Sequence, residues 1–211
     1  CLYRITSEKV RITGSSRTDS GVHATGLVAN FRTSSSVPPG KFSFAMNRML
    51  PDDIVIKHSE QVSDDFHSRF SVKSKKYIYK VLNTTHPSAL MRNRVYHYPG
   101  KLDDTKMQKA IKHFEGTHDF AAFMSSGSSV ESTVRTIISA NVKKSEDIII
   151  FEITGNGFLY NMVRIIVGTV LEVGSGKKAE EQIPNIISIL DRSKSGKTAP
   201  AHGLYLVEVN Y

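Results

Sequence analysis

The chain has 211 residues, a formal net charge of +8 at pH 7 and a pI near 9.5. A hydrophobic content of 39% and a charged content of 23% are typical of globular proteins, and no apolar run approaches the ~20 residues of a membrane-spanning helix. The single cysteine excludes an intramolecular disulfide framework and fits a reducing compartment, so we expect a cytoplasmic protein with no membrane partner. The excess of Lys and Arg favours a polyanionic partner, although a solvated surface would explain it as well.

Strands are predicted where β-branched and aromatic residues are enriched or where apolar and polar residues alternate. These segments are residues 9–13, 27–32, 54–61, 75–83, 94–98, 137–143, 148–154 and 204–210. Residues 144–147 separate two of them closely enough to predict a hairpin.

Helices are predicted where apolar residues recur at i, i+3, i+4 and i+7, around residues 42–49 and 107–114. The second has Asp103 or Asp104 as its candidate N-cap. Residues 158–173 are apolar around most of a helical circumference, which indicates a largely buried helix. Because strands and helices follow one another without a regular β-α-β order, we expect an α+β fold with a largely antiparallel sheet and helices packed on it.

Asp19 lies in a loop of Gly, Ser and Thr, residues 15–26, between the first two predicted strands. Loops held by strands often carry catalytic side chains. Arg17 is close enough in sequence to favour the ionised carboxylate if the loop is partly desolvated. The local residues alone fit an ordinary turn better, with Asp19 bonded to nearby backbone amides.

Arg164 stands inside the apolar segment 158–173. A guanidinium there cannot lose its proton, and leaving it buried without a partner is costly. The side chain must therefore meet a carboxylate, backbone carbonyls or water. An ion pair with Glu152 or Glu172, or a side chain that reaches solvent at the helix edge, is compatible with the residues.

Tyr77 and Tyr79 lie two residues apart on a predicted strand and so share one face of it. Packing in the core is the usual role of such a pair. Lys73, Lys75 and Lys76 precede Tyr77, and cations clustered beside an aromatic residue are typical of nucleic-acid contacts.

Residues 17–24, Arg-Thr-Asp-Ser-Gly-Val-His-Ala, resemble the signature loop Arg-Thr-Asp-x-Gly-Val-His-Ala of the TruA-type tRNA pseudouridine synthases. Further similar segments follow in the family's order over nearly the whole chain: residues 47–51, 65–70, 76–79, 158–164 and 199–206. The family's N-terminal strand and Tyr-Asp-Gly...Gly-Trp-Gln segment have no counterpart in these 211 residues. An absent first strand would leave a sheet edge unpaired.

The resemblance implies a two-lobed pseudouridine synthase fold with a central active cleft. We expect a truncated N-terminal lobe at residues 1–64 with the catalytic-aspartate loop, and a C-terminal lobe at residues 65–211 with the tyrosine strand and the buried-arginine helix. The implied activity is isomerisation of uridine to pseudouridine at positions 38–40 of the tRNA anticodon stem-loop by a homodimer. Neither a metal nor an organic cofactor is required, because the reaction involves no redox change, phosphate transfer or hydrolysis.

Under the resemblance, Asp19 is the catalytic carboxylate and Arg164 is the basic residue that pairs with it. Binding of tRNA is expected from one aromatic residue and several basic or polar ones: Tyr77, Arg17, His23, Arg69 and Lys76. Tyr77 would stack on the target base, and Tyr79 would support it. A histidine bonded to loop backbone is an equally good interpretation of His23. Whether Asp19 attacks the ribose or the base, or removes a sugar proton, stays open.

Two other functions are compatible with the residues. A non-catalytic RNA-binding or tRNA-folding module would share the charge and the aromatic residues but would not need Asp19. A hydrolase could use Asp19 and His23 in acid-base catalysis, but it would need an activated water and a second carboxylate that no motif supplies.

Overall fold

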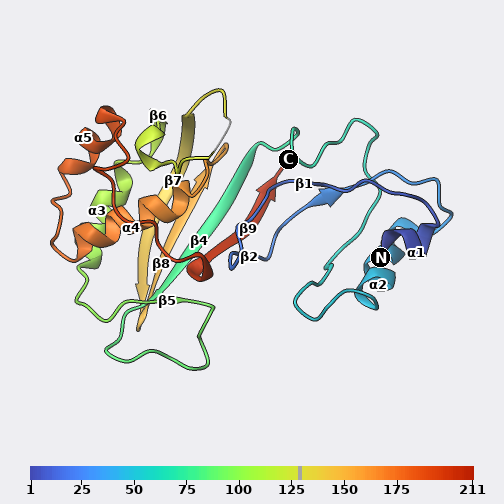
Figure 1. Cartoon of the computed structure of the whole chain (residues 1–211), viewed down its shortest axis with the longest axis horizontal. Coiled ribbons are helices and arrows are strands. Elements are labelled where there is room, and N and C mark those ends of the chain that lie inside the picture. The colour runs from blue at the N-terminus through green and yellow to red at the C-terminus, as the bar shows by residue number, and fades with distance from the viewer. Residues whose placement is uncertain (128–129) are drawn as a thin grey trace. The chain divides into compact units, whose positions relative to one another are not determined.

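The computed structural model describes residues 1–127 and 130–211 (Figure 1). Contacts within the chain divide it into two compact units: unit 1 is Cys1–Ser16 with Val28–Ser71, and unit 2 is Arg17–Leu27 with Val72–Tyr211. The loop with Asp19 thus groups with unit 2, whereas the sequence assigned it to an N-terminal lobe ending at residue 64. That lobe boundary stays a prediction.

Unit 1 consists of short elements. They are α1 (Leu2–Thr6), β1 (Thr13–Gly14), β3 (Ala29–Asn30), the 3-10 helix η1 (Pro39–Lys41) and α2 (Phe42–Asn47). β1 and β3 pair in an antiparallel manner, so the strands expected on both sides of the Asp19 loop are present but shorter than expected.

The strand expected at residues 54–61 does not form within unit 1. The backbone N–H of Ile56 donates to Asn47 Oδ1 at 2.7 Å, and Asn47 Nδ2 donates to the Ile56 carbonyl at 2.9 Å. A side-chain amide therefore takes the place that a neighbouring strand would have. Ile54 and Val55 are exposed, so this segment has no buried face that would fix a strand register.

Unit 2 is built on one sheet, which has seven strands in the described part of the chain. The strands are β2 (His23–Ala24), β4 (Ser74–Leu82), β5 (Tyr96–His97), β6 (Gly116–Asp119), β7 (Val134–Ser145), β8 (Ile148–Gly155) and β9 (Leu204–Asn210). Their order is β2-β9-β4-β8-β7-β6, with β5 also paired to β4. Only β2 with β9 and β4 with β5 run parallel among these pairs. The largely antiparallel sheet and the hairpin between β7 and β8 are confirmed.

Helices of unit 2 supply the rest of its core. They are α3 (Asp104–Lys112), the 3-10 helix η2 (Ala121–Phe123), α4 (Met162–Gly174), α5 (Gln182–Ile189) and the 3-10 helix η3 (Ala201–Gly203). Asp103 is the N-cap of α3 and accepts the Lys106 N–H at 2.9 Å.

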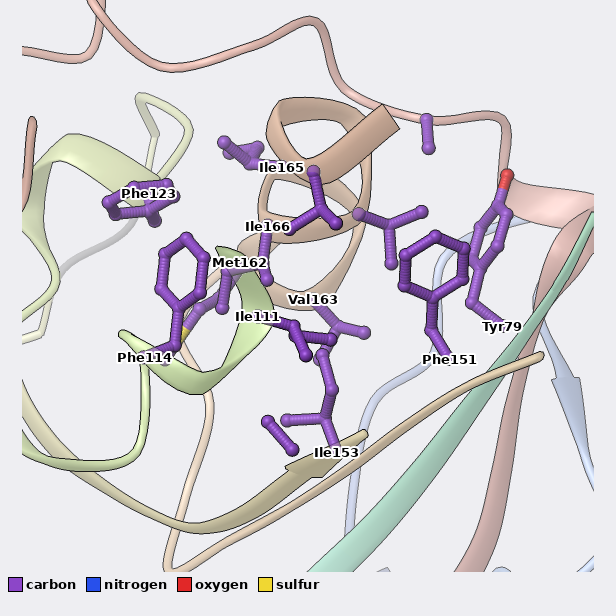
Figure 2. Close-up of a cluster of buried hydrophobic side chains, with 14 of the residues drawn as sticks. Tyr79, Ile111, Phe114, Phe123, Phe151, Ile153, Met162, Val163, Ile165 and Ile166 are labelled. Atoms are coloured by element: carbon purple, nitrogen blue, oxygen red, sulfur yellow. The ribbon is translucent and has the colours of Figure 1, made fainter. Parts of the chain in front are cut away.

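The helix α4 is the central element of this core (Figure 2). Its side chains Met162, Val163, Ile165 and Ile166 lie among Ile111 of α3, Phe114 just after that helix, and Phe151 and Ile153 of β8. Full burial of each such side chain stabilises the fold by about 1.5–3 kcal/mol. In the described residues no helix combines the length and the apolar character needed to cross a membrane.

Candidate active site

The backbone of unit 2 fixes the loop that carries Asp19. The Val22 N–H donates to the Asp19 carbonyl at 3.0 Å and closes a tight turn. Gly21 inside this turn has φ +83°, a left-handed conformation that glycine adopts without strain. This bond joins two backbone groups, whereas the turn expected from the sequence would have the Asp19 side chain as the acceptor.

The sheet anchors the same loop directly after the turn. His23 and Ala24 form β2 and pair in parallel with Tyr205 and Leu206 of β9. Gly26 then passes so close to the carbonyl of Val207 that any Cβ there would overlap it. Both contacts hold the end of the loop against β9, where β2 forms the edge of the sheet.

Arg164 contacts Asp19 from the first turn of α4. Its Nη1 lies 3.3 Å from Asp19 Oδ2, which is the pair that the resemblance implies. The side chain of Arg164 is 16% exposed and that of Asp19 is 37% exposed, so the carboxylate stays accessible while the guanidinium is largely covered. The roles of both residues in a reaction stay predictions.

The two glutamates that could have paired with Arg164 have lysine partners instead. Glu152 lies 3.1 Å from Lys143 Nζ and 3.7 Å from Lys76 Nζ, and Glu172 lies 3.5 Å from Lys178 Nζ. Lysine ammonium groups therefore balance the charges of both glutamates.

Arg164 also makes hydrogen bonds to Ala199 and Asn161. Its Nε donates to the Ala199 carbonyl at 2.7 Å, and the Ala199 N–H donates to the Arg164 carbonyl at 3.1 Å. A second proton of Nη1 is directed to Asn161 Oδ1 at 2.7 Å. The guanidinium is therefore fixed by two short bonds that do not involve Asp19.

Ala199 belongs to a segment, residues 191–200, that crosses α4 and that we call the strap. The strap lies so close to the helix that a Cβ on Gly168 would overlap the Lys197 carbonyl. The Gly196 N–H donates to Thr169 Oγ1 at 2.8 Å. The close approach thus requires glycine at position 168, and it fixes how far Ala199 lies from the helix.

Tyr79 of β4 holds the far end of the strap. Its ring is fully buried, and its hydroxyl donates to the Pro200 carbonyl at 2.7 Å. Burial raises the pKa of Tyr79 far above its ordinary value, so the hydroxyl remains a donor at every working pH. This contact agrees with a supporting role for Tyr79.

Tyr77 lies two residues earlier on β4, opposite Leu206 of β9. Since Leu206 is in turn opposite Ala24, the sheet register puts Tyr77 in line with the end of the Asp19 loop. The Tyr77 ring packs edge-to-face on Phe158 with centroids 5.0 Å apart, and the residue is 9% exposed. Any stacking on a base would therefore use the small exposed part of the ring.

The remaining residues expected to bind tRNA have different surroundings. Arg17 is exposed, and Lys76 is half-buried beside Glu152. Arg69 belongs to unit 1, where its guanidinium carbon lies 5.4 Å from the centroid of the Phe70 ring.

His23 is bonded to backbone rather than pointing freely from the loop. Its Nε2 lies 2.7 Å from the Asn93 carbonyl, and its ring stacks on Tyr205 with centroids 4.6 Å apart. The tyrosine hydroxyl donates to the neighbouring Arg94 carbonyl at 2.6 Å. This geometry favours the backbone-bound interpretation of His23, and contact with RNA stays a prediction.

Within the described residues, His, Cys, Asp and Glu side chains form no group of three or more that could hold a metal ion.

The site is thus an accessible aspartate, on a loop anchored to the sheet by β2, that faces a largely covered arginine of α4. A family model described as tRNA pseudouridine synthase matches residues 2–71 and 110–211, and the chain belongs to this family.

Curated relatives are similar over nearly the whole chain. The tRNA pseudouridine synthase A of Acetivibrio thermocellus is 57% identical over 207 residues, which are 98% of this chain and 85% of the relative. The protein of the same name from Ruminiclostridium cellulolyticum is 56% identical over 211 residues, 100% of this chain and 86% of the relative. The tRNA pseudouridine synthase A 2 of Clostridium tetani is 51% identical over 206 residues, 98% of this chain and 83% of the relative.

Proposed function

We propose that the protein isomerises uridine to pseudouridine in tRNA, at positions 38–40 of the anticodon stem-loop, with Asp19 as the catalytic carboxylate. The observation that carries this proposal is the contact between Asp19 and Arg164, in a chain that belongs to the pseudouridine synthase family. A binding module would have no need for an accessible carboxylate held by a largely buried arginine.

In the reaction, the uracil stays on the same ribose, but the atom that joins it to the sugar changes from N1 to C5. The bond from C1′ to N1 breaks and a bond from C1′ to C5 forms, while C5 loses a proton and N1 gains one. Asp19 acts as an ionised carboxylate, either as a nucleophile or as the base that removes a proton. Arg164 holds this carboxylate in place through the contact between Nη1 and Asp19 Oδ2.

The target base must leave the helical stack of the RNA before it can reach Asp19. Such flipping costs a few kcal/mol, which contacts to the extruded base must offset. Tyr77 lies on the strand beside the loop anchor, and the base would stack on the exposed part of its ring. A fully accessible aromatic ring contributes about 1–3 kcal/mol to stacking, which is the upper bound for Tyr77.

Phosphate contacts supply most of the affinity and little of the selection. Arg17 and Arg69 are exposed and suit this role. Lys76 must share its charge with Glu152, so its contribution is smaller. An RNA contact of His23 would use its Nδ1 edge, because Nε2 is engaged by the Asn93 carbonyl.

We further propose a cytoplasmic homodimer. The single cysteine fits a reducing compartment. Val134 and Ile138, two apolar residues of β7, are each about half exposed, which suits burial against a second copy. Sedimentation equilibrium at micromolar concentration tests the dimer directly, and a monomer mass at every concentration would contradict it.

Incubation of the protein with an unmodified tRNA transcript, followed by mapping of pseudouridine at single-nucleotide resolution, tests the activity. Pseudouridine is expected only at uridines 38–40, and a transcript with cytidine at these positions serves as the matched control. Tight binding without any pseudouridine would support the RNA-binding module instead. Modification at uridines elsewhere would leave the activity but contradict the site.

A further inference from the structure

Asn161 stands at the N-cap of α4 but does not cap the helix. An N-cap asparagine normally accepts a hydrogen bond from a backbone N–H of the first turn. Here the residue is left-handed, with φ 61° and ψ 7°, and its side chain makes no bond to the helix N–H groups. The amide is therefore used for another purpose.

Both ends of this amide have specific partners. Its Oδ1 accepts from Arg164 Nη1 at 2.7 Å, and its Nδ2 donates to Ser125 Oγ at 3.0 Å. Ser125 is itself tied to the same segment, because its backbone N–H donates to the Tyr160 carbonyl at 3.1 Å. The Asn161 side chain is thus held at one end and holds Arg164 at the other.

The hydrogen bond that Nη1 donates to Asn161 fixes the directions of the two N–H groups of Nη1. This nitrogen has two protons, and the shorter bond to Asn161 takes one, which leaves the other for Asp19 Oδ2 at 3.3 Å. Because the guanidinium is planar, fixing Nε on Ala199 and one proton on Asn161 fixes the remaining proton as well.

We propose that Asn161 is a positioning residue of the reaction: a neutral acceptor that aims Arg164 at Asp19 without taking its charge. An amide oxygen orients the cation but leaves the net positive charge available to the catalytic carboxylate. A carboxylate at the same place would compete with Asp19 for that charge. The inference rests on the proposed function.

The two roles open to Asn161 make opposite predictions for Asn161→Asp. If the residue only began the helix, Asp would serve as well as Asn or better, since a negative charge is favoured at a helix N-terminus. If it positions Arg164, the variant stays folded but loses turnover. Asn161→Gly removes the side chain and keeps the left-handed backbone without strain.

The experiment measures kcat and KM for tRNA separately, together with the melting temperature, for the wild type and both variants. For Asn161→Gly we expect kcat to fall about ten- to a hundredfold, as for loss of one hydrogen bond to a charged group, with KM within about twofold. For Asn161→Asp we expect a lower kcat still, an unchanged KM and a melting temperature no lower than that of Asn161→Gly. Glu146→Gly, at an exposed left-handed residue of the β7–β8 turn, is the matched control and should keep the wild-type kcat.

A kcat of Asn161→Asp equal to or above that of Asn161→Gly would overturn the proposal, because the added carboxylate would then not compete for Arg164. A wild-type kcat in Asn161→Gly would overturn it too. If the wild type itself forms no pseudouridine in this assay, the proposed function fails along with the inference. An active wild type with active Asn161 variants contradicts the inference alone.

Discussion

Gly168→Ala separates the tertiary role of the strap from the helix propensity of α4. In an isolated helix this change would be stabilising by about 1 kcal/mol, since alanine loses less backbone entropy than glycine. In this protein the new Cβ would overlap the Lys197 carbonyl, which is backbone and cannot turn away. The strap must therefore lift from the helix.

Lifting the strap breaks identifiable contacts. The bonds from the Gly196 N–H to Thr169 and from the Ala199 N–H to the Arg164 carbonyl contribute about 0.5–1.5 kcal/mol each. Forcing a methyl group into a packed site costs about 1–3 kcal/mol more. After the gain in helix propensity is subtracted, we expect a net destabilisation of about 1–5 kcal/mol and a melting temperature lower by roughly 3–15 °C.

Turnover is expected to fall as well, because Ala199 holds Arg164 Nε. Calorimetry and tRNA modification at a temperature well below the transition measure the two effects separately. Gly174→Ala in the same helix is the matched control: its Cβ meets the flexible side chain of Met107 and should leave turnover unchanged. A Gly168→Ala protein that is more stable than the wild type and fully active would refute the role of the strap.

Two further predictions concern the base platform and an acidic residue of the core edge. For Tyr77→Ala we expect a far greater loss of kcat/KM than for Tyr77→Phe, because phenylalanine retains the stacking face. A loss of about a hundredfold in the Phe variant would instead indicate proton transfer by the hydroxyl. Equal activity of the wild type and both variants would show that Tyr77 is only a core residue. Burial raises the pKa of Glu115, but the Lys112 ammonium and the Ala140 N–H outweigh it and hold that pKa below the ordinary 4.5. The stability that ionised Glu115 provides is thus present above pH 4.5 and lost as the pH falls through the lowered pKa. Glu115→Gln should therefore be less stable than the wild type at pH 7, and the two stabilities should converge in acid. In urea unfolding, a stability difference between the two proteins that does not change with pH would contradict this assignment.

Strong local patterns predicted the sheet of unit 2 well. The strand Leu204–Asn210 and the β7–β8 hairpin have clear alternation, and each is paired in the structure as the pattern requires. Helix α5, Gln182–Ile189, was not predicted, although Ile183, Ile186 and Ile187 have helical spacing. Its proline at position 184 lies in the first turn, where a helix tolerates it. The strand expected at residues 54–61 failed because composition does not report a partner, and the partner here is the Asn47 side chain.

The same limit applies to the site. The sequence indicated that Arg164 needs a partner, and the resemblance paired it with Asp19, which the local residues alone would place in an ordinary turn. No pattern in the sequence indicated the roles of Ala199 or of the Asn161 amide. The bond between Arg164 and Ala199 spans 35 residues, and Asn161 begins its helix in a left-handed conformation, so neither contact leaves a periodic pattern. The sequence did show Gly168 within an apolar helix, and a glycine there is a usable sign of close backbone approach.

Asp19→Asn tests the central claim most directly, because it keeps the shape of the side chain and removes its charge. The measurement is pseudouridine formation at uridines 38–40 beside the tRNA dissociation constant at the same salt concentration. We expect turnover to be abolished and the dissociation constant to stay within a few-fold of the wild type, since phosphate contacts dominate binding. Turnover close to that of the wild type would contradict catalysis by Asp19.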